Sequence, residues 1–145
     1  MSIDSINDDA GRTPNEPLPQ ALVVEDQDEL RTVLSAMIEG IGFEVTQASN
    51  ADVAQALLIA GGRFDLLLTD VNMPGSLDGA GLAKVARQLD ANMTIIVATG
   101  RQENLRIQLP LDVPVLSKPF RMHELLSLVK RTRQRRDEQG SDVVT

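Results

Sequence analysis

The chain has 145 residues, which suits one compact domain with a hydrophobic core and leaves no room for a second domain of ordinary size. Its 14 Lys and Arg against 21 Asp and Glu give a net charge of −7, which argues against a general binder of nucleic acid or anionic membranes. Without Cys it has no disulfide, thiolate zinc site or cysteine nucleophile, and with three Phe as its only aromatic residues it is poorly equipped for base stacking. No apolar run reaches the ~18 residues of a membrane span and the polar N-terminus is no signal peptide, so we expect a cytoplasmic protein.

Patterning divides the chain into three parts. Residues 1–20 are polar and proline-rich with little apolar patterning, which predicts a flexible leader. Residues 21–136 carry regular apolar patterns and form the predicted folded domain. Residues 137–145 lack a helical period and are expected to be a disordered tail.

Within the folded part, continuous apolar runs of strand length alternate with segments whose apolar residues recur at helical spacing. The predicted elements are, in chain order, a strand at 21–24, a helix at 30–41, a strand at 43–45, a helix from Asn50 to Gly61, a strand at 66–69, a helix from Asp78 to Leu89, a strand at 94–98, a short helix within 101–112, a strand at 113–116 that Pro114 interrupts, and a helix beginning at Met122. Asn50 and Asp78 are expected to cap their helices, and Gly40 and Gly42 to end the first one.

This alternation predicts an α/β fold. Strands that are apolar throughout must be covered on both faces, and crossover helices between parallel strands provide that cover. We therefore expect a doubly wound parallel sheet with helices on both faces.

Polar residues follow the predicted strands. Glu25 and Asp26 end the first, Asp70 the third and Thr99 the fourth, while the fifth runs into Lys118. Sites in such sheets form at the carboxyl ends of the strands. Three acids in close quarters call for a hard divalent cation such as Mg²⁺, and a carboxylate beside Mg²⁺, a lysine and a hydroxyl is an arrangement for phosphoryl transfer that yields an aspartyl phosphate.

The segments that carry these residues resemble the receiver domain of bacterial two-component response regulators. The resemblance covers residues 21–136 and rests on four motifs: Leu22-Val23-Val24-Glu25-Asp26, Leu67-Leu68-Thr69-Asp70-Val71-Asn72-Met73-Pro74-Gly75, Ile96-Val97-Ala98-Thr99-Gly100 and Ser117-Lys118-Pro119-Phe120. It implies a flavodoxin-like sheet of five strands in the order 2-1-3-4-5.

The resemblance also implies residue roles. Asp70 would accept a phosphoryl group from the phosphohistidine of a histidine kinase or histidine phosphotransfer protein, and Thr99 and Lys118 would bind that group. The implied ligands of Mg²⁺, with Mn²⁺ as the alternative ion, are Glu25 through a coordinated water, Asp26, Asp70 and the backbone carbonyl of Asn72. Pro74 and Pro119 would shape the loops, and the Lys118–Pro119 peptide is often cis in this family.

The sequence departs from the family pattern in three ways. Residues 75–79 include one residue more than the usual loop, and the interval from Thr99 to Lys118 is short. Val115 occupies the position where many receivers place a Tyr or Phe that swings inward as the Thr moves. We therefore expect ordering of residues 100–112, rather than an aromatic side chain, to transmit the signal.

The leading hypothesis is a stand-alone receiver without a DNA-binding or enzymatic output, acting as a phosphorylation-dependent protein–protein switch or phosphorelay intermediate. It would not be an enzyme beyond its own phosphorylation and dephosphorylation. One alternative is a Mg²⁺-dependent small-molecule phosphohydrolase, which would want a second Asp as general acid where this chain has Asn72. Another is a receiver-like scaffold that binds partners without phosphorylation.

Two further features have simpler interpretations. His123, the one histidine, is interpreted as a surface residue. The basic run at 130–136 is interpreted as a solvated helix end whose charge suits the helix dipole, with docking of a kinase or nucleic acid as the minor alternative. We expect neither DNA binding nor membrane binding.

Overall fold

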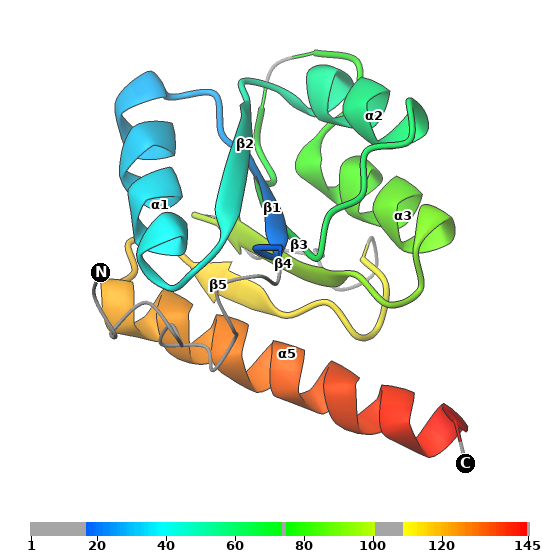
Figure 1. Ribbon diagram of the computed structural model, residues 1–145. Helices are drawn as coiled ribbons and strands as arrows, with labels where there is room; N and C mark the ends of the chain where they lie inside the picture. Colours follow the sequence, from blue (N-terminus) through cyan, green and yellow to red (C-terminus); the bar gives the residue numbers. More distant parts are fainter. Residues whose placement is uncertain (1–16, 74, 101–108, 145) are drawn as a thin grey trace, which may run out of the picture.

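A computed structural model of the chain describes residues 17–73, 75–100 and 109–144, and strands and helices alternate along it (Figure 1). The elements are β1 (Gln20–Val24), α1 (Asp28–Gly40), β2 (Glu44–Ala48), α2 (Ala51–Ile59), β3 (Leu66–Asp70), α3 (Gly79–Leu89), β4 (Thr94–Thr99), β5 (Val115–Ser117) and α5 (Met122–Val144).

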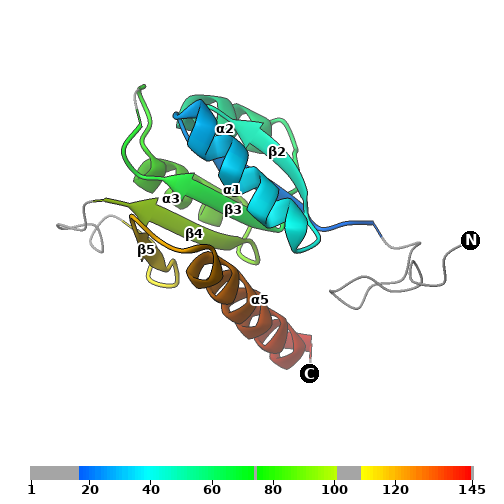
Figure 2. The same ribbon diagram turned by 90° about the vertical axis from the view of Figure 1, so that its left-hand side faces the viewer.

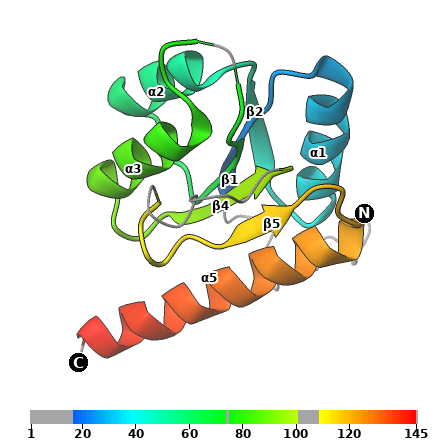
Figure 3. The ribbon, with the colours of Figure 1, turned by 180° about the vertical axis from the view of Figure 1, so that it is seen from behind.

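The strands form one parallel sheet in the order β2-β1-β3-β4-β5. Helices α1 and α5 cover one face, and α2 and α3 cover the other, as Figure 3 shows from behind. The predicted doubly wound α/β fold with strand order 2-1-3-4-5 is confirmed.

Side chains of each central strand point alternately into two cores. In β1, Leu22 and Val24 pack on the side of α2 and α3, while Ala21 and Val23 pack on the side of α1 and α5. Strands β3 and β4 are likewise buried along their whole length. Burial on both faces explains why these strands are apolar throughout instead of alternating.

Helix starts follow the predicted caps. The Asn50 side chain accepts a hydrogen bond from the Val53 N–H at 2.8 Å, and the Asp78 side chain accepts one from the Gly81 N–H at 2.8 Å. Each bond satisfies a backbone donor that the first helical turn leaves unpaired. Both predicted caps are confirmed.

Glycines shape the turns after the first two helices. Helix α1 ends at Gly40 and α2 ends at Ile59. Gly42 and Gly61 then adopt φ angles of 101° and 99°, in the left-handed region that favours glycine. Gly42 is thus the residue that turns the chain from α1 toward β2.

The fifth strand and the segment before it differ from prediction. Strand β5 begins at Val115 rather than at residue 113, because Pro114 has no N–H to donate to a neighbouring strand. Val113 is fully buried, so its apolar character reflects core packing rather than strand pairing. Of the short helix expected within 101–112, residues 101–108 lie outside the described residues, and 109–112 form no helix.

Both ends of the expected folded domain also need adjustment. Gln20 belongs to β1, while most of the predicted leader, residues 1–16, lies outside the described residues. The prediction of a disordered tail from residue 137 is wrong over 137–144, because α5 continues to Val144 and projects beyond the sheet (Figures 1 and 2). Residues 137–144 carry no apolar period and include Gly140 and Ser141, so the local sequence gives no signal for this extension of the helix.

Among the residues that the structure describes, no helix has the length and apolar character required to cross a membrane.

Gly79 provides a test of the packing between α3 and β3. A Cβ atom there would clash with the backbone oxygen of Asp70, whereas a Cβ at Gly40 would meet no atom within 4 Å. We expect Gly79→Ala to lower the free energy of unfolding by about 3 kcal/mol, since the backbone must shift. Gly40→Ala, the matched control, should stay within about 0.5 kcal/mol of wild type in urea denaturation. Equal stability of the two variants would contradict this packing.

Candidate functional site

The register of the sheet brings the four predicted strand ends together. Val24 pairs with Thr69, so the next residues, Glu25 and Asp70, lie side by side. Asp70 pairs with Ala98, next to Thr99. Thr99 in turn pairs with Ser117, and the Lys118 N–H donates to the Thr99 carbonyl at 2.9 Å. Residues far apart in sequence therefore meet at one edge, as predicted.

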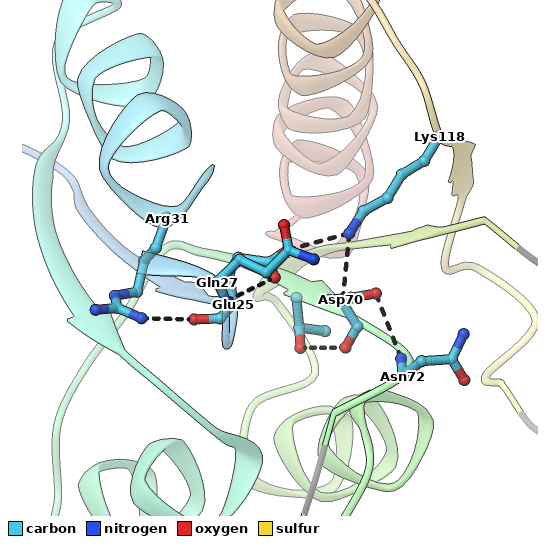
Figure 4. A network of polar contacts seen from close by, with 7 residues as sticks. Glu25, Gln27, Arg31, Asp70, Asn72 and Lys118 are labelled. Carbon is cyan, nitrogen blue, oxygen red and sulfur yellow. Dashed lines mark hydrogen bonds and ion pairs between the residues drawn. The ribbon is translucent and has the colours of Figure 1, made fainter. Parts of the chain in front are cut away.

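Lys118 links two acids of this edge. Its Nζ lies 3.1 Å from Oε1 of Glu25 and 3.2 Å from Oδ2 of Asp70 (Figure 4). Glu25 is 1% exposed and Asp70 is 8% exposed. The ammonium thus joins the ends of β1 and β3 from a residue that directly follows β5.

Asp26 completes a cluster of three acids. One carboxylate oxygen from each of Glu25, Asp26 and Asp70 can be chosen so that all lie within 4.8 Å of one another, and Asp26 is exposed. Three carboxylates against one ammonium leave a charge of −3 + 1 = −2 when all are ionised. Hard divalent cations prefer such oxygen donors, so the residues present fit Mg²⁺.

The pKa values of the buried pair reflect burial and the contact between the two groups. Burial raises the pKa of Glu25 above its usual value, although hydrogen bonds from the Gln27 N–H and from Lys118 oppose the shift. Burial pushes the pKa of Lys118 down, but its hydrogen bond to Glu25 and the charge of Asp70 outweigh that effect and raise it. The contacts of Lys118 therefore favour its charged form, whereas burial disfavours the ionised form of Glu25.

Local hydrogen bonds fix Asp70. Its Oδ1 accepts from the Asn72 N–H at 3.3 Å, and its backbone oxygen accepts from the Thr69 hydroxyl at 2.9 Å. These bonds leave Oδ2 to Lys118 and orient both carboxylate oxygens toward the edge of the sheet. The Asn72 side chain itself is exposed.

The other predicted site residues take the following places. Thr99 ends β4 with no exposed surface. The Lys118–Pro119 peptide is cis, the isomer that the family resemblance favours. Pro74 lies outside the described residues. His123 is exposed in the first turn of α5 and takes no part in the cluster.

The loop that carries the predicted extra residue is attached to α2. Asp52, in the first turn of that helix, accepts hydrogen bonds from the Ser76 hydroxyl at 2.7 Å and from the Ser76 N–H at 3.2 Å. Gly75, with a φ of 123°, lies directly against the same carboxylate, which leaves no room for a Cβ. Sequence reasoning missed Asp52, which carried only the signal of an acid in a first helical turn.

Val115 packs against the core on the side of α2 and α3, and no aromatic ring accompanies it. Phe64 precedes β3 and Phe43 precedes β2, so both lie at the opposite edge of the sheet. Phe120 packs on the other face, with α1 and α5. The three Phe are all the aromatic residues of the chain, so the site has no aromatic side chain at the usual switch position. The segment 100–112, expected to replace it, lies mostly outside the described residues.

Arg31 is the second residue that sequence reasoning missed. Its guanidinium donates to the Glu25 carbonyl at 2.8 Å (Figure 4). It also donates to Gln47 at 3.2 Å and pairs with Asp28 at 2.7 Å. Only the spacing of Asp28 and Arg31, three residues apart on a helix, signalled a contact in the sequence. The contacts to Glu25 and Gln47 depend on how α1 packs on the sheet.

The fold and this edge together define a doubly wound α/β domain with an acidic, lysine-paired site suited to a divalent cation. The family described as the response regulator receiver domain matches residues 21–130. The chain is 33% identical over 117 residues to the response regulator receiver protein CpdR of Brucella abortus, which covers 79% of this chain and 96% of that protein.

Solved structures agree. The chain is similar to the crystal structure of a response regulator receiver protein from Sinorhizobium medicae, with a TM-score of 0.78 and 28% identity, covering 82% of this chain and 97% of that one. It is also similar to the response regulator protein TrrA of Thermotoga maritima, crystallised in complex with Mg²⁺ and BeF, with a TM-score of 0.68 and 25% identity, covering 79% of this chain and 99% of that one. The chain belongs to the receiver-domain family of two-component response regulators.

Glu25 gives the site a testable pH signature. Because its pKa is raised in the folded state, the folded protein binds more protons than the unfolded chain between the unfolded value of 4.5 and the folded value. Stability should therefore fall as pH rises through that window. We expect Glu25→Gln to be more stable than wild type at pH 7 in metal-free buffer, with the difference closing toward pH 4.5, as measured by urea unfolding with chelator present.

The control is Glu39→Gln, which changes an exposed acid of α1. Its difference from wild type should be small, because surface substitutions away from packed or paired groups change stability little. A Glu25→Gln variant that is less stable than wild type at every pH would contradict the rise in the pKa of Glu25 caused by burial.

Proposed function

We propose that this receiver is the phosphoacceptor of a two-component pathway, with Asp70 taking the phosphoryl group from the phosphohistidine of a histidine kinase or histidine phosphotransfer protein. The observation that carries the proposal is the contact of Lys118 Nζ with both Glu25 and Asp70 at the carboxyl edge of the sheet. This contact supports a site in which the Lys118 ammonium lies close enough to Asp70 to pair with a phosphoryl group added to that carboxylate.

The residues have distinct roles in the transfer. A carboxylate oxygen of Asp70 attacks phosphorus, a P–O bond forms as the P–N bond of the phosphohistidine breaks, and the released imidazole takes up a proton from solvent. Lys118 pairs with the phosphoryl oxygens, and the Thr99 hydroxyl donates a hydrogen bond to them. Both residues already lie at this edge, because Thr99 is the last residue of β4 and Lys118 directly follows β5.

A divalent cation belongs to this site in the proposal. Glu25 through a coordinated water, Asp26, Asp70 and the Asn72 carbonyl would hold Mg²⁺, or Mn²⁺ in its place. The bound ion supplies positive charge that offsets the acids and the phosphoryl oxygens. The complex of TrrA with Mg²⁺ and BeF supports this assignment.

The output is proposed to be a change in protein–protein contacts, in a switch or a phosphorelay. A phosphoryl group adds about −1.5 to −2 charge, which draws Lys118 and Thr99 toward it. With Val115 beside them, no aromatic side chain can carry that movement outward. The match extends over 96% of CpdR, which supports a receiver that acts as a single domain. A cytoplasmic location is part of the proposal.

Acyl-phosphate labelling tests the proposal. Incubating the protein with Mg²⁺ and acetyl phosphate should add one phosphoryl mass in intact mass spectrometry, and Asp70→Asn should abolish it, because the carboxamide is not a nucleophile for this step. Asp90→Asn, at the opposite edge after α3, is the matched control and should label like wild type.

Other outcomes decide between functions. Labelling of Asp70→Asn equal to wild type would overturn the proposal. Steady turnover of phosphorylated metabolites would favour a phosphohydrolase, although the Asn72 carboxamide cannot act as its general acid. Partner binding that is identical with and without Mg²⁺ and acetyl phosphate, in a protein that never labels, would favour a scaffold.

A further inference from the structure

We propose that Arg31 is a positioning residue that holds the Glu25–Asp26 peptide in the orientation needed to bind Mg²⁺. The inference rests on the proposed function, because it concerns the cation of that same site. Arg31 does not approach the reacting atoms. It acts on the backbone that presents two of the acids.

The guanidinium of Arg31 joins three separate pieces of the chain. Nη1 donates to the backbone oxygen of Glu25 at 2.8 Å, Nη2 pairs with Oδ1 of Asp28 at 2.7 Å, and Nε donates to Oε1 of Gln47 at 3.2 Å. These acceptors lie at the end of β1, at the start of α1 and on β2. The Arg31 side chain is 16% exposed, so most of it is shielded from competing water.

Of these three contacts, the one with the backbone oxygen of Glu25 has the most direct effect on the position of the acids. That oxygen belongs to the peptide unit between Glu25 and Asp26, so its direction sets where the Asp26 side chain leaves the backbone. On the other side, the Glu25 N–H donates to the Ala48 oxygen at 3.1 Å. With both groups bonded, the backbone of Glu25 cannot rotate without breaking a hydrogen bond.

Lysine could not make the same set of contacts. The planar guanidinium offers donors in several fixed directions, whereas an ammonium at the end of a flexible chain cannot reach three acceptors on three elements in this geometry. Arg31→Lys should therefore keep the positive charge and lose most of the orientation. Comparing Arg31→Lys with Arg31→Ala therefore separates the orienting role of the guanidinium from the effect of its positive charge.

Arg87 is a matched control elsewhere in the same protein. Its Nη1 donates to the carbonyls of Asp90, Ala91 and Met93, at 3.2, 3.1 and 2.7 Å, and its Nη2 pairs with Asp112 at 2.6 Å. Its side chain is 17% exposed, close to the value for Arg31. It binds the loop that enters β4, so it lies at the edge of the sheet away from the acids.

The experiment compares Arg31→Ala, Arg31→Lys and Arg87→Ala in the full chain. The dissociation constant for Mg²⁺ is measured by isothermal titration calorimetry without any phosphodonor, and stability is measured by urea unfolding in chelator. We expect Arg31→Ala to weaken Mg²⁺ binding about 10-fold or more, as loss of a residue that orients metal ligands commonly does. Arg31→Lys should weaken it by a smaller factor, and Arg87→Ala should leave it within about 2-fold of wild type while losing stability.

Two results would overturn the inference. One is Mg²⁺ binding by Arg31→Ala at wild-type affinity. The other is an equal loss of affinity in Arg87→Ala, which would trace the effect to general stability. If Arg31→Ala does not fold, Arg31→Lys alone decides, since unchanged affinity there would also reject orientation by the guanidinium.

The outcome is separable from that of the proposed function. A wild-type protein that binds Mg²⁺, loses affinity in Arg31→Ala and yet never accepts a phosphoryl group would reject the function and keep the positioning role. A protein that labels at Asp70 but binds Mg²⁺ equally well without Arg31 would keep the proposed function and reject the positioning role.

Discussion

The site depends on a buried carboxylate whose polar atoms are all engaged. The Glu25 N–H donates to Ala48, its carbonyl accepts from Arg31, Oε1 accepts from Lys118 and Oε2 accepts from the Gln27 N–H at 3.1 Å. An ionised acid out of contact with water is costly unless it is paired and fully hydrogen-bonded. These four bonds make the position tolerable, and they also fix it.

The negative charge of the acids at this edge is only partly compensated. Lys118 balances one of the three acids, and burial still raises the pKa of Glu25. A domain selected for stability alone would replace such a cluster with apolar side chains, which often stabilises a protein. The loss of stability is explained if the acids serve to bind a cation. It is confined to the carboxyl edge of the sheet, and the two apolar cores remain intact.

Much of the fold followed from local patterns, and the exceptions share a cause. Apolar runs and capping residues such as Asn50 and Asp78 are local signals, and the structure agrees with them. The identity of the clustered acids was also predictable, because parallel strands bring their carboxyl ends to one edge. The contact between Arg31 and Gln47 was not, since it depends on the angle at which α1 packs against an edge strand. The continuation of α5 to Val144 was also missed, because residues 137–144 carry no apolar period and include Gly140 and Ser141, which have low intrinsic helix propensity.

The three acids therefore divide into a fixed member and more accessible ones. Glu25 is anchored through backbone and side chain, so it can serve as the reference against which the others are placed. Asp26 shares a peptide unit with it but is exposed, which suits a residue that must meet a cation arriving from solvent. Asp70 lies between these extremes, held through Oδ1 by the Asn72 N–H and through Oδ2 by Lys118. Because Lys118 contacts both Glu25 and Asp70, any charge added at Asp70 would redistribute the bonds of the fixed acid as well. Under the proposed function, this shared lysine couples the binding of the cation to the phosphorylation of Asp70.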